Sequence, residues 1–69
     1  MIEVDVRGLS CPIPVVRTKQ AMDQNPREDI SVLLDFEVAV ENVTRLAQSR
    51  GYKVVRTDTD DGYELSLKP

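Results

Sequence analysis

The segment DVRGLSCPIP, residues 5–14, holds Cys11, the one cysteine of this 69-residue chain. The chain has no histidine, which a cysteine hydrolase normally uses as its base. Pro14 stands where the second cysteine of a Cys-x-x-Cys dithiol would be, so dithiol exchange within the chain is excluded. One thiolate with Met1 and Met22 as thioethers is a poor set for a soft metal. What remains is chemistry that needs one exposed sulfur: carrying a group, forming a mixed disulfide or sensing oxidation.

The two prolines predict that Cys11 caps the start of a helix. Pro12 then takes the first helical position, where a missing N–H costs nothing. Pro14 takes the third position, still inside the turn whose N–H groups lack helical partners. The sulfur would lie at the positive end of the helix dipole, near the N–H groups of Ile13 and Val15, which favours the thiolate. We also expect the prolines to form an apolar rim around the sulfur that suits a docking protein.

A buried, structural Cys11 is the competing interpretation, because a lone cysteine often packs as a small hydrophobe. The small residues of the segment are typical of a surface loop and favour the reactive thiol, but the residues alone leave both open. Arg7 could help to stabilise a thiolate, although we expect it to pair with Asp5 or Asp35 at the surface. Gly8 is expected to supply a backbone geometry that other residues avoid.

Hydrophobic periodicity predicts the order strand, helix, strand, helix, strand, strand. Asn25-Pro26 should stop the first helix and Gly51 the second, and Asp61-Gly62 is a hairpin signal between the last two strands. The predicted strands span 2–6, 30–35, 52–58 and 63–68, and the predicted helices span 12–24 and 36–51.

These elements predict an α+β two-layer sandwich, βαβαββ, with two helices packed on one face of a four-stranded mixed sheet. The helices share a face because strand–helix–strand crossovers are right-handed. The open face of the sheet should carry Glu3, Asp5, Lys53 and Glu64 into water. We expect residues 1–69 to form a single domain.

Charge and composition argue against several classes of function. Twelve acidic residues outnumber nine basic ones, for a net charge of −3, and a nucleic-acid partner is not expected on so acidic a chain. The first residues lack the basic start of a signal peptide, and no apolar run is long enough to span a membrane. A lone cysteine without an export signal fits a reducing cytoplasm. We expect no cofactor and no metal site.

The motif Asp5-x-Arg7-Gly8-Leu9-x-Cys11-Pro12-x-Pro14 resembles the signature of the TusA-like (SirA-like) sulfur-carrier family, and the element order agrees over nearly the whole chain. Residues 38–54 are similar to the YedF branch, whose members are associated with selenium metabolism and often carry a second, C-terminal domain. Nothing here corresponds to that second domain, so the chain resembles a stand-alone or excised N-terminal part. Phe36 departs from the small polar residue expected before the second helix.

The resemblance implies a sulfur relay. In TusA itself the matching cysteine accepts sulfane sulfur as a persulfide from a cysteine desulfurase and hands it to the next carrier, on the way to tRNA thiolation. Here Cys11 would be the persulfide acceptor and Arg7, Gly8, Pro12 and Pro14 the supporting motif. The protein would be a carrier rather than a catalyst, with a persulfide donor and a downstream acceptor protein as partners.

Two other hypotheses belong to different classes of function. In the first, the domain is a regulatory interaction module whose cysteine is dispensable, linked to selenium metabolism through the YedF resemblance. In the second it binds nucleic acid, since the predicted fold resembles the C-terminal domain of translation initiation factor 3. The acidic balance and the shortage of aromatic residues weigh against the second.

Overall fold

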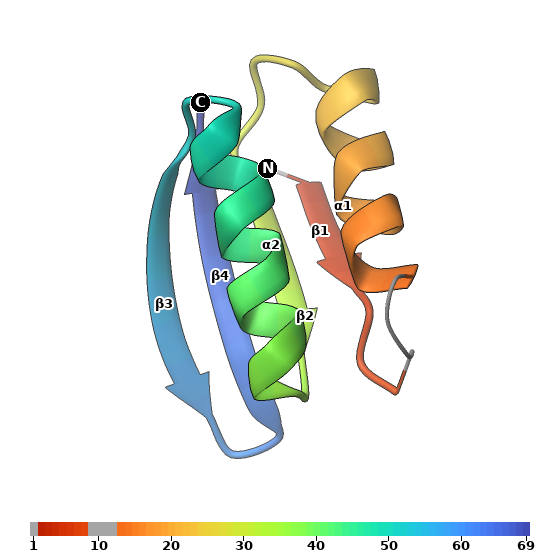
Figure 1. Cartoon of the computed structure of the whole chain (residues 1–69), viewed down its shortest axis with the longest axis vertical. Helices are drawn as coiled ribbons and strands as arrows, with labels where there is room; N and C mark the ends of the chain where they lie inside the picture. The colour runs from red at the N-terminus through yellow and green to blue at the C-terminus, as the bar shows by residue number, and fades with distance from the viewer. Residues whose placement is uncertain (1, 9–12) are drawn as a thin grey trace.

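The structure, a computed structural model, describes residues 2–8 and 13–69. Figure 1 shows two helices side by side on one face of a four-stranded sheet, which confirms the predicted two-layer sandwich. The elements follow the predicted order: β1 (Ile2–Asp5), α1 (Ile13–Gln24), β2 (Ile30–Leu34), α2 (Glu37–Ser49), β3 (Lys53–Thr59) and β4 (Gly62–Lys68).

The strand order in the sheet is β1-β2-β4-β3, so β2 and β4 are central and β1 and β3 form the edges. β1 pairs with β2 in parallel, and β4 pairs antiparallel with both β2 and β3. β2 lies between β1 and β4, and all of its residues except the half-buried Leu33 are buried, in agreement with the almost continuous apolar run of its sequence, ISVLL. The carboxyl ends of β1 and β2 and the hairpin between β3 and β4 meet at one end of the molecule (Figure 1).

The core lies between the sheet and the helices. On α2, the residues that recur at helical spacing face the core: Val40, Val43 and Ala47 are buried and Leu46 is partly buried, and Ala39 is buried beside them. On α1, Thr18 and Met22 are buried and Val15 is partly buried against the core, while Ile13 and Val16 are exposed. Pro14 and Ala21 are the other buried residues of α1. The sheet contributes the buried side chains of Ile30, Val32, Leu34, Leu65 and Leu67.

The opposite face of the sheet is polar. Glu3, Asp5 and Lys53 are exposed there as predicted, whereas Glu64 is half-buried. Its carboxylate accepts a hydrogen bond of 3.0 Å from the hydroxyl of Ser31, which is buried on β2. This bond satisfies a polar group that would otherwise be costly to bury.

The predicted ends of the helices are confirmed. Beyond α1, the backbone N–H and side-chain amide of Asn25 both donate to the carbonyl of Ala21, at 3.0 and 3.1 Å. Beyond α2, Gly51 has φ +81°, a left-handed conformation that glycine adopts without strain. The predicted hairpin also forms, but Gly62 begins β4 rather than lying in the centre of the turn.

Candidate functional site

The motif segment leaves the sheet at the carboxyl end of β1. Val6 is buried, and its N–H donates to the carbonyl of Leu33 at 3.0 Å, which extends the pairing with β2 one residue past the end of β1. Arg7 and Gly8 then turn away from the sheet. The core thus holds Val6, between the motif residues Asp5 and Arg7, in place.

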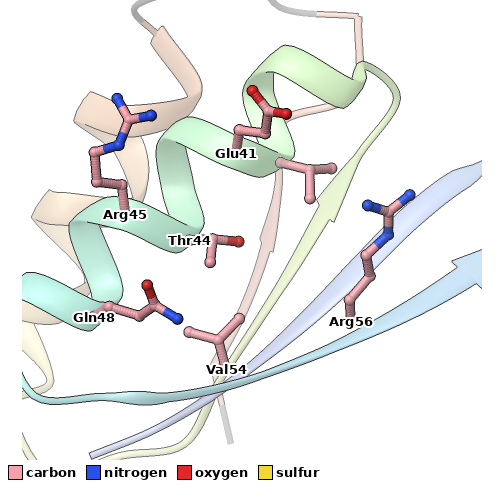
Figure 2. A pocket seen from close by; sticks show the side chains of 7 residues that line it. Glu41, Thr44, Arg45, Gln48, Val54 and Arg56 are labelled. Atoms are coloured by element: carbon pink, nitrogen blue, oxygen red, sulfur yellow. The ribbon is translucent and has the colours of Figure 1, made fainter.

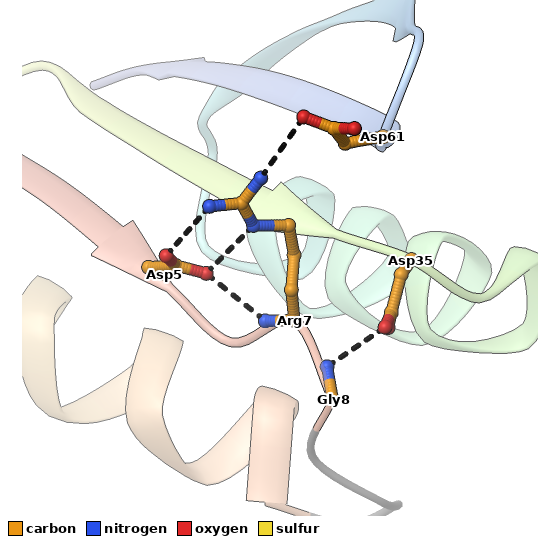
Figure 3. A network of polar contacts seen from close by, with 5 residues as sticks. All are labelled: Asp5, Arg7, Gly8, Asp35 and Asp61. Carbon is orange, nitrogen blue, oxygen red and sulfur yellow. Dashed lines mark hydrogen bonds and ion pairs between the residues drawn. The ribbon is translucent and has the colours of Figure 1, made fainter.

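Arg7 is held by a carboxylate two residues before it. Its Nε and Nη2 donate to the two carboxylate oxygens of Asp5 at 3.0 and 2.9 Å, and its backbone N–H donates to the same carboxylate at 3.1 Å (Figure 3). The side-chain hydrogen bonds lower the pKa of Asp5 and raise the pKa of Arg7. Arg7 also lies 3.7 Å from a carboxylate oxygen of Asp61 in the β3–β4 hairpin. The expected surface pair is therefore formed with Asp5, not with Asp35.

Gly8 joins the motif to the connection between β2 and α2. It has φ +78°, and its N–H donates to the carboxylate of Asp35 at 2.8 Å (Figure 3). No heavy atom lies within 4 Å of the place where a Cβ would stand, so the need for glycine here is conformational and not steric. The predicted backbone role of Gly8 is confirmed, and Asp35 gains a role that the sequence did not reveal.

On the other side of the cysteine, Pro14 anchors the chain in the core. Its side chain is fully buried, and its carbonyl accepts a hydrogen bond of 2.8 Å from the hydroxyl of Thr18. The expectation that both prolines form an exposed apolar rim is therefore wrong for Pro14, because its ring is buried in the first turn of α1. Cys11, Pro12 and the predicted helix cap lie outside the described residues. The described residues on either side of them are held in place, Gly8 by its hydrogen bond to Asp35 and Pro14 by its burial.

A second polar network fixes the start of α2 on the hairpin. The hydroxyl of Tyr63 donates to the carboxylate of Glu37 at 3.0 Å, and this bond raises the pKa of Tyr63. The guanidinium of Arg56 lies 3.0 Å from Glu37 and 3.1 Å from Asp58, and 4.7 Å from the centre of the Tyr63 ring. This cluster could not be predicted from the sequence, because the alternation of the strands indicates which face a side chain occupies but not its partner on a helix.

Phe36 occupies the N-cap position of α2. It has an extended conformation, φ −127° and ψ 137°, and makes no side-chain hydrogen bond to the open N–H groups of the helix. Its side chain is 55% exposed. The departure from a small polar residue therefore leaves α2 without a side-chain cap and places an aromatic ring in water.

An open groove of about 520 Å³ lies between α2 and β3 (Figure 2). None of its lining residues belongs to the motif, and its Arg56 is already paired with Glu37 and Asp58. It is therefore not the candidate site. Across residues 2–8 and 13–69, no group of three or more metal-binding side chains lies together, and no helix is long and apolar enough to cross a membrane. The groove is lined by Val40, Glu41, Thr44, Arg45, Gln48, Val54 and Arg56.

We predict that Asp35→Ala loosens the motif segment without unfolding the protein. The change removes the acceptor of the Gly8 N–H, and one hydrogen bond of this kind stabilises a fold by about 1 kcal/mol. Amide hydrogen exchange at Gly8 should become faster, while exchange in the central strands should change little. Asp61→Ala is the matched control, since it removes a carboxylate 3.7 Å from Arg7 and leaves the Gly8 N–H bonded. Equal exchange at Gly8 in both variants would contradict the prediction.

Known proteins are similar to this chain in sequence and in fold over most of its length. The family model for sulfurtransferase TusA matches residues 2–68. A Methanocaldococcus jannaschii protein named "Putative sulfur carrier protein MJ0990" is 37% identical, over 99% of this chain and 93% of its own. A Bacillus subtilis protein named "Putative sulfur carrier protein YrkI" is 33% identical, over 86% of this chain and 79% of its own.

A solved structure has the same fold as this chain. The crystal structure of a SirA-like protein from Desulfitobacterium hafniense superposes with a TM-score of 0.91 and 31% sequence identity, covering 99% of this chain and 96% of the other. The resemblance seen in residues 5–14 thus extends through both helices and all four strands. The chain belongs to the TusA (SirA-like) family.

Proposed function

We propose that the protein carries sulfur as a persulfide on Cys11 and passes it to a partner protein. One observation supports this above the others: α1 begins at Ile13, directly after Cys11-Pro12, in a chain that matches the TusA family over residues 2–68. The names of the Methanocaldococcus and Bacillus relatives point to the same role.

The start of α1 is the source of positive potential nearest to Cys11 in the sequence. Only Pro12 separates Cys11 from Ile13, so their Cα atoms are at most about 7 Å apart by chain geometry. Open N–H groups and the helix dipole favour an anion within the first turn of a helix. Arg7 contributes less, because the carboxylate of Asp5 already neutralises its charge. The proposed thiolate therefore depends mainly on the helix.

The proposed transfer needs no external oxidant or reductant. The Cys11 thiolate attacks the outer, sulfane sulfur of a cysteine persulfide on the donor protein. A new S–S bond forms to Cys11 while the S–S bond of the donor breaks, and the donor cysteine leaves as a thiolate with the electron pair. The sulfane sulfur keeps its oxidation state, and the persulfide anion on Cys11 occupies the same helix terminus as the thiolate did. Delivery to an acceptor repeats these steps with the roles exchanged.

The proposal includes the partners that such a relay requires. A cysteine desulfurase or another persulfide protein supplies the sulfur, and a downstream protein thiol receives it, with tRNA thiolation as one destination. Both exchanges suit a reducing cytoplasm, where unpaired thiols persist. Selenium is the alternative cargo, since its chemistry on a thiolate follows the same steps.

Mass spectrometry of the intact protein tests the proposal. Reduced protein is incubated with a cysteine desulfurase and L-cysteine, and we predict a gain of one sulfur atom that peptide mapping assigns to Cys11. A reductant should remove the adduct, and omission of L-cysteine should prevent it. No adduct on Cys11 from either a desulfurase or inorganic polysulfide would count decisively against a sulfur carrier.

A further inference from the structure

β3 is an exposed edge of the sheet. It spans Lys53–Thr59, and in the described part of the chain it pairs with β4 on one side only. Figure 1 shows it at the outer border of the sheet, on the far side from α1. All of its residues are exposed except Val54, which is half-buried. An edge strand of this length presents unpaired N–H and C=O groups that can bond to a strand from another chain.

The pairing with β4 determines which residues of β3 have open backbone groups. The hairpin closes on the pair Thr59–Gly62, and hydrogen-bonded pairs alternate with non-hydrogen-bonded pairs along an antiparallel ladder. The odd-numbered residues of β3 therefore direct their N–H and C=O groups toward β4, while Val54, Arg56 and Asp58 direct theirs away from the sheet. A further strand beside β3 would bond to these outward groups.

Val55 is a large apolar residue in the middle of this edge. Its side chain is 55% exposed and lies on the open face of the sheet, next to Ser66 of β4. A β-branched residue packs well against another one on a neighbouring strand. Antiparallel pairing of two copies of β3 about a two-fold axis at Val55 supplies this neighbour, because the two Val55 side chains then lie opposite each other. The pair is non-hydrogen-bonded, the type in which opposite side chains lie closest.

The same register suits the neighbours of Val55. It places Val54 of each copy opposite Arg56 of the other, so the open backbone groups of both residues bond across the axis. Val54 and Arg56 also line the groove beside α2 (Figure 2), where the aliphatic part of each Arg56 can cover the half-buried Val54 of the other copy. An axis at Arg56 would instead set two guanidinium groups opposite each other, which is unfavourable.

The charges of β3 permit this pairing. Arg56 already forms ion pairs with Glu37 and Asp58 of its own chain, at 3.0 and 3.1 Å. Among the described residues, Lys53 at the start of β3 and Asp60 in the hairpin after it have no ion-pair partner. Antiparallel pairing brings the Lys53 end of each strand beside the Asp60 end of the other, so these opposite charges attract each other across the interface.

We infer that β3 is a dimerisation edge, at which a second copy of this chain adds its own β3 antiparallel, with the two-fold axis at Val55. The strands of both copies then form one continuous sheet with the helices of both copies on the same face. The partner is a second copy because Val55 and the oppositely charged ends of β3 complement themselves. The motif segment leaves the sheet from β1, at the opposite edge, so it stays uncovered and the inference is independent of the proposed function.

Analytical ultracentrifugation under reducing conditions tests the association. Because one strand pair is a small interface, the wild type should be a mixture of monomer and dimer whose dimer fraction rises with concentration up to about 1 mM. Val55→Lys should raise the dissociation constant about tenfold or more, since two ammonium groups then meet at the axis. Its melting temperature should change little, because the Val55 side chain is exposed.

Val16→Lys is the matched control for charge. Val16 is 47% exposed, but it lies on α1, which packs over β1 and β2 at the other side of the molecule. This variant should dimerise like the wild type. A chain that stays monomeric up to about 1 mM would overturn the inference and leave the edge to a strand from a different protein. A dimer that survives Val55→Lys, or one that Val16→Lys weakens equally, would also overturn it.

A cysteine cross-link tests the register. In a Cys11→Ser background, Val55→Cys should form a disulfide-linked dimer on mild oxidation, because opposite residues of a non-hydrogen-bonded pair have Cα atoms about 4.5 Å apart. Thr57→Cys is the control, since Thr57 is exposed on the same face of β3 but faces Lys53 of the second copy. The two Thr57 positions lie about 13 Å apart in this register, too far for a disulfide. Equal cross-linking at both positions would contradict the proposed pairing.

Discussion

A Cys11→Ser variant is expected to take up no sulfur from any donor. The serine hydroxyl is not ionised near neutral pH and forms no stable bond to sulfane sulfur, so both the attack and the storage of the persulfide are lost. The loss should be complete, because the chain has no second cysteine to take over. Intact-mass spectrometry after incubation with a desulfurase and L-cysteine measures it directly, with wild type as the positive control.

The same variant decides between the three interpretations of Cys11. If the thiol is exposed, Cys11→Ser should melt within a few degrees of the wild type. If it is a buried hydrophobe, an unsatisfied hydroxyl costs about 1–3 kcal/mol, and the melting temperature of so small a domain should fall by about 5 °C or more. A dispensable cysteine in an interaction module predicts a third result, in which partner binding and the cellular phenotype survive the change. A sulfur carrier requires that the phenotype be lost.

The fold was predictable because its main signals are periodic and local. Val40, Val43 and Ala47 recur at a spacing that places them on one face of a helix, where they can be buried together. The apolar run of β2 is typical of a central strand. Gly51 ends α2 as expected because the chain needs a positive φ there, which is a property of one residue and not of its surroundings. These features hold whatever the rest of the molecule does.

The arrangement around the motif was less predictable because it depends on contacts between distant segments. Proline is typical of surface turns, yet Pro14 is buried. The rotation of α1 about its axis determines this, and it leaves Val16 exposed. Asp35 is 27 residues from Gly8, and spacing alone could not show that its carboxylate accepts that N–H rather than pairing with Arg7. The sequence located the motif, while tertiary structure determined what holds it.

Gly62 links the stability of the fold to the geometry of the motif, and Gly62→Ala is the second change with a large expected effect. The residue has φ +146°, which is open almost exclusively to glycine. A Cβ there would overlap the carbonyl oxygen of Leu34 and approach the Cα of Asp35 to 3.0 Å. These are backbone atoms and cannot rotate away, so β2 must move at the point where it leads to Asp35.

We expect Gly62→Ala to destabilise the protein by about 3–5 kcal/mol, from backbone strain and overpacking together. The free energy of unfolding of a chain of this length is about 4–10 kcal/mol in all, so a large part of the variant should be unfolded at 37 °C. Urea denaturation followed by circular dichroism measures the loss.

Gly51→Ala is the control that separates strain from overlap. Gly51 also has positive φ, +81°, but no heavy atom lies within 4 Å of its missing Cβ, so alanine should cost about 1 kcal/mol there. Equal losses at both positions would show that the overlap with Leu34 is relieved without cost. If Gly62→Ala is less stable than Gly51→Ala, the molecules of Gly62→Ala that remain folded should also show faster hydrogen exchange at the Gly8 amide. Displacing Leu34 and Asp35 moves the carboxylate that holds this amide, so a residue in the hairpin would control the segment that carries Cys11.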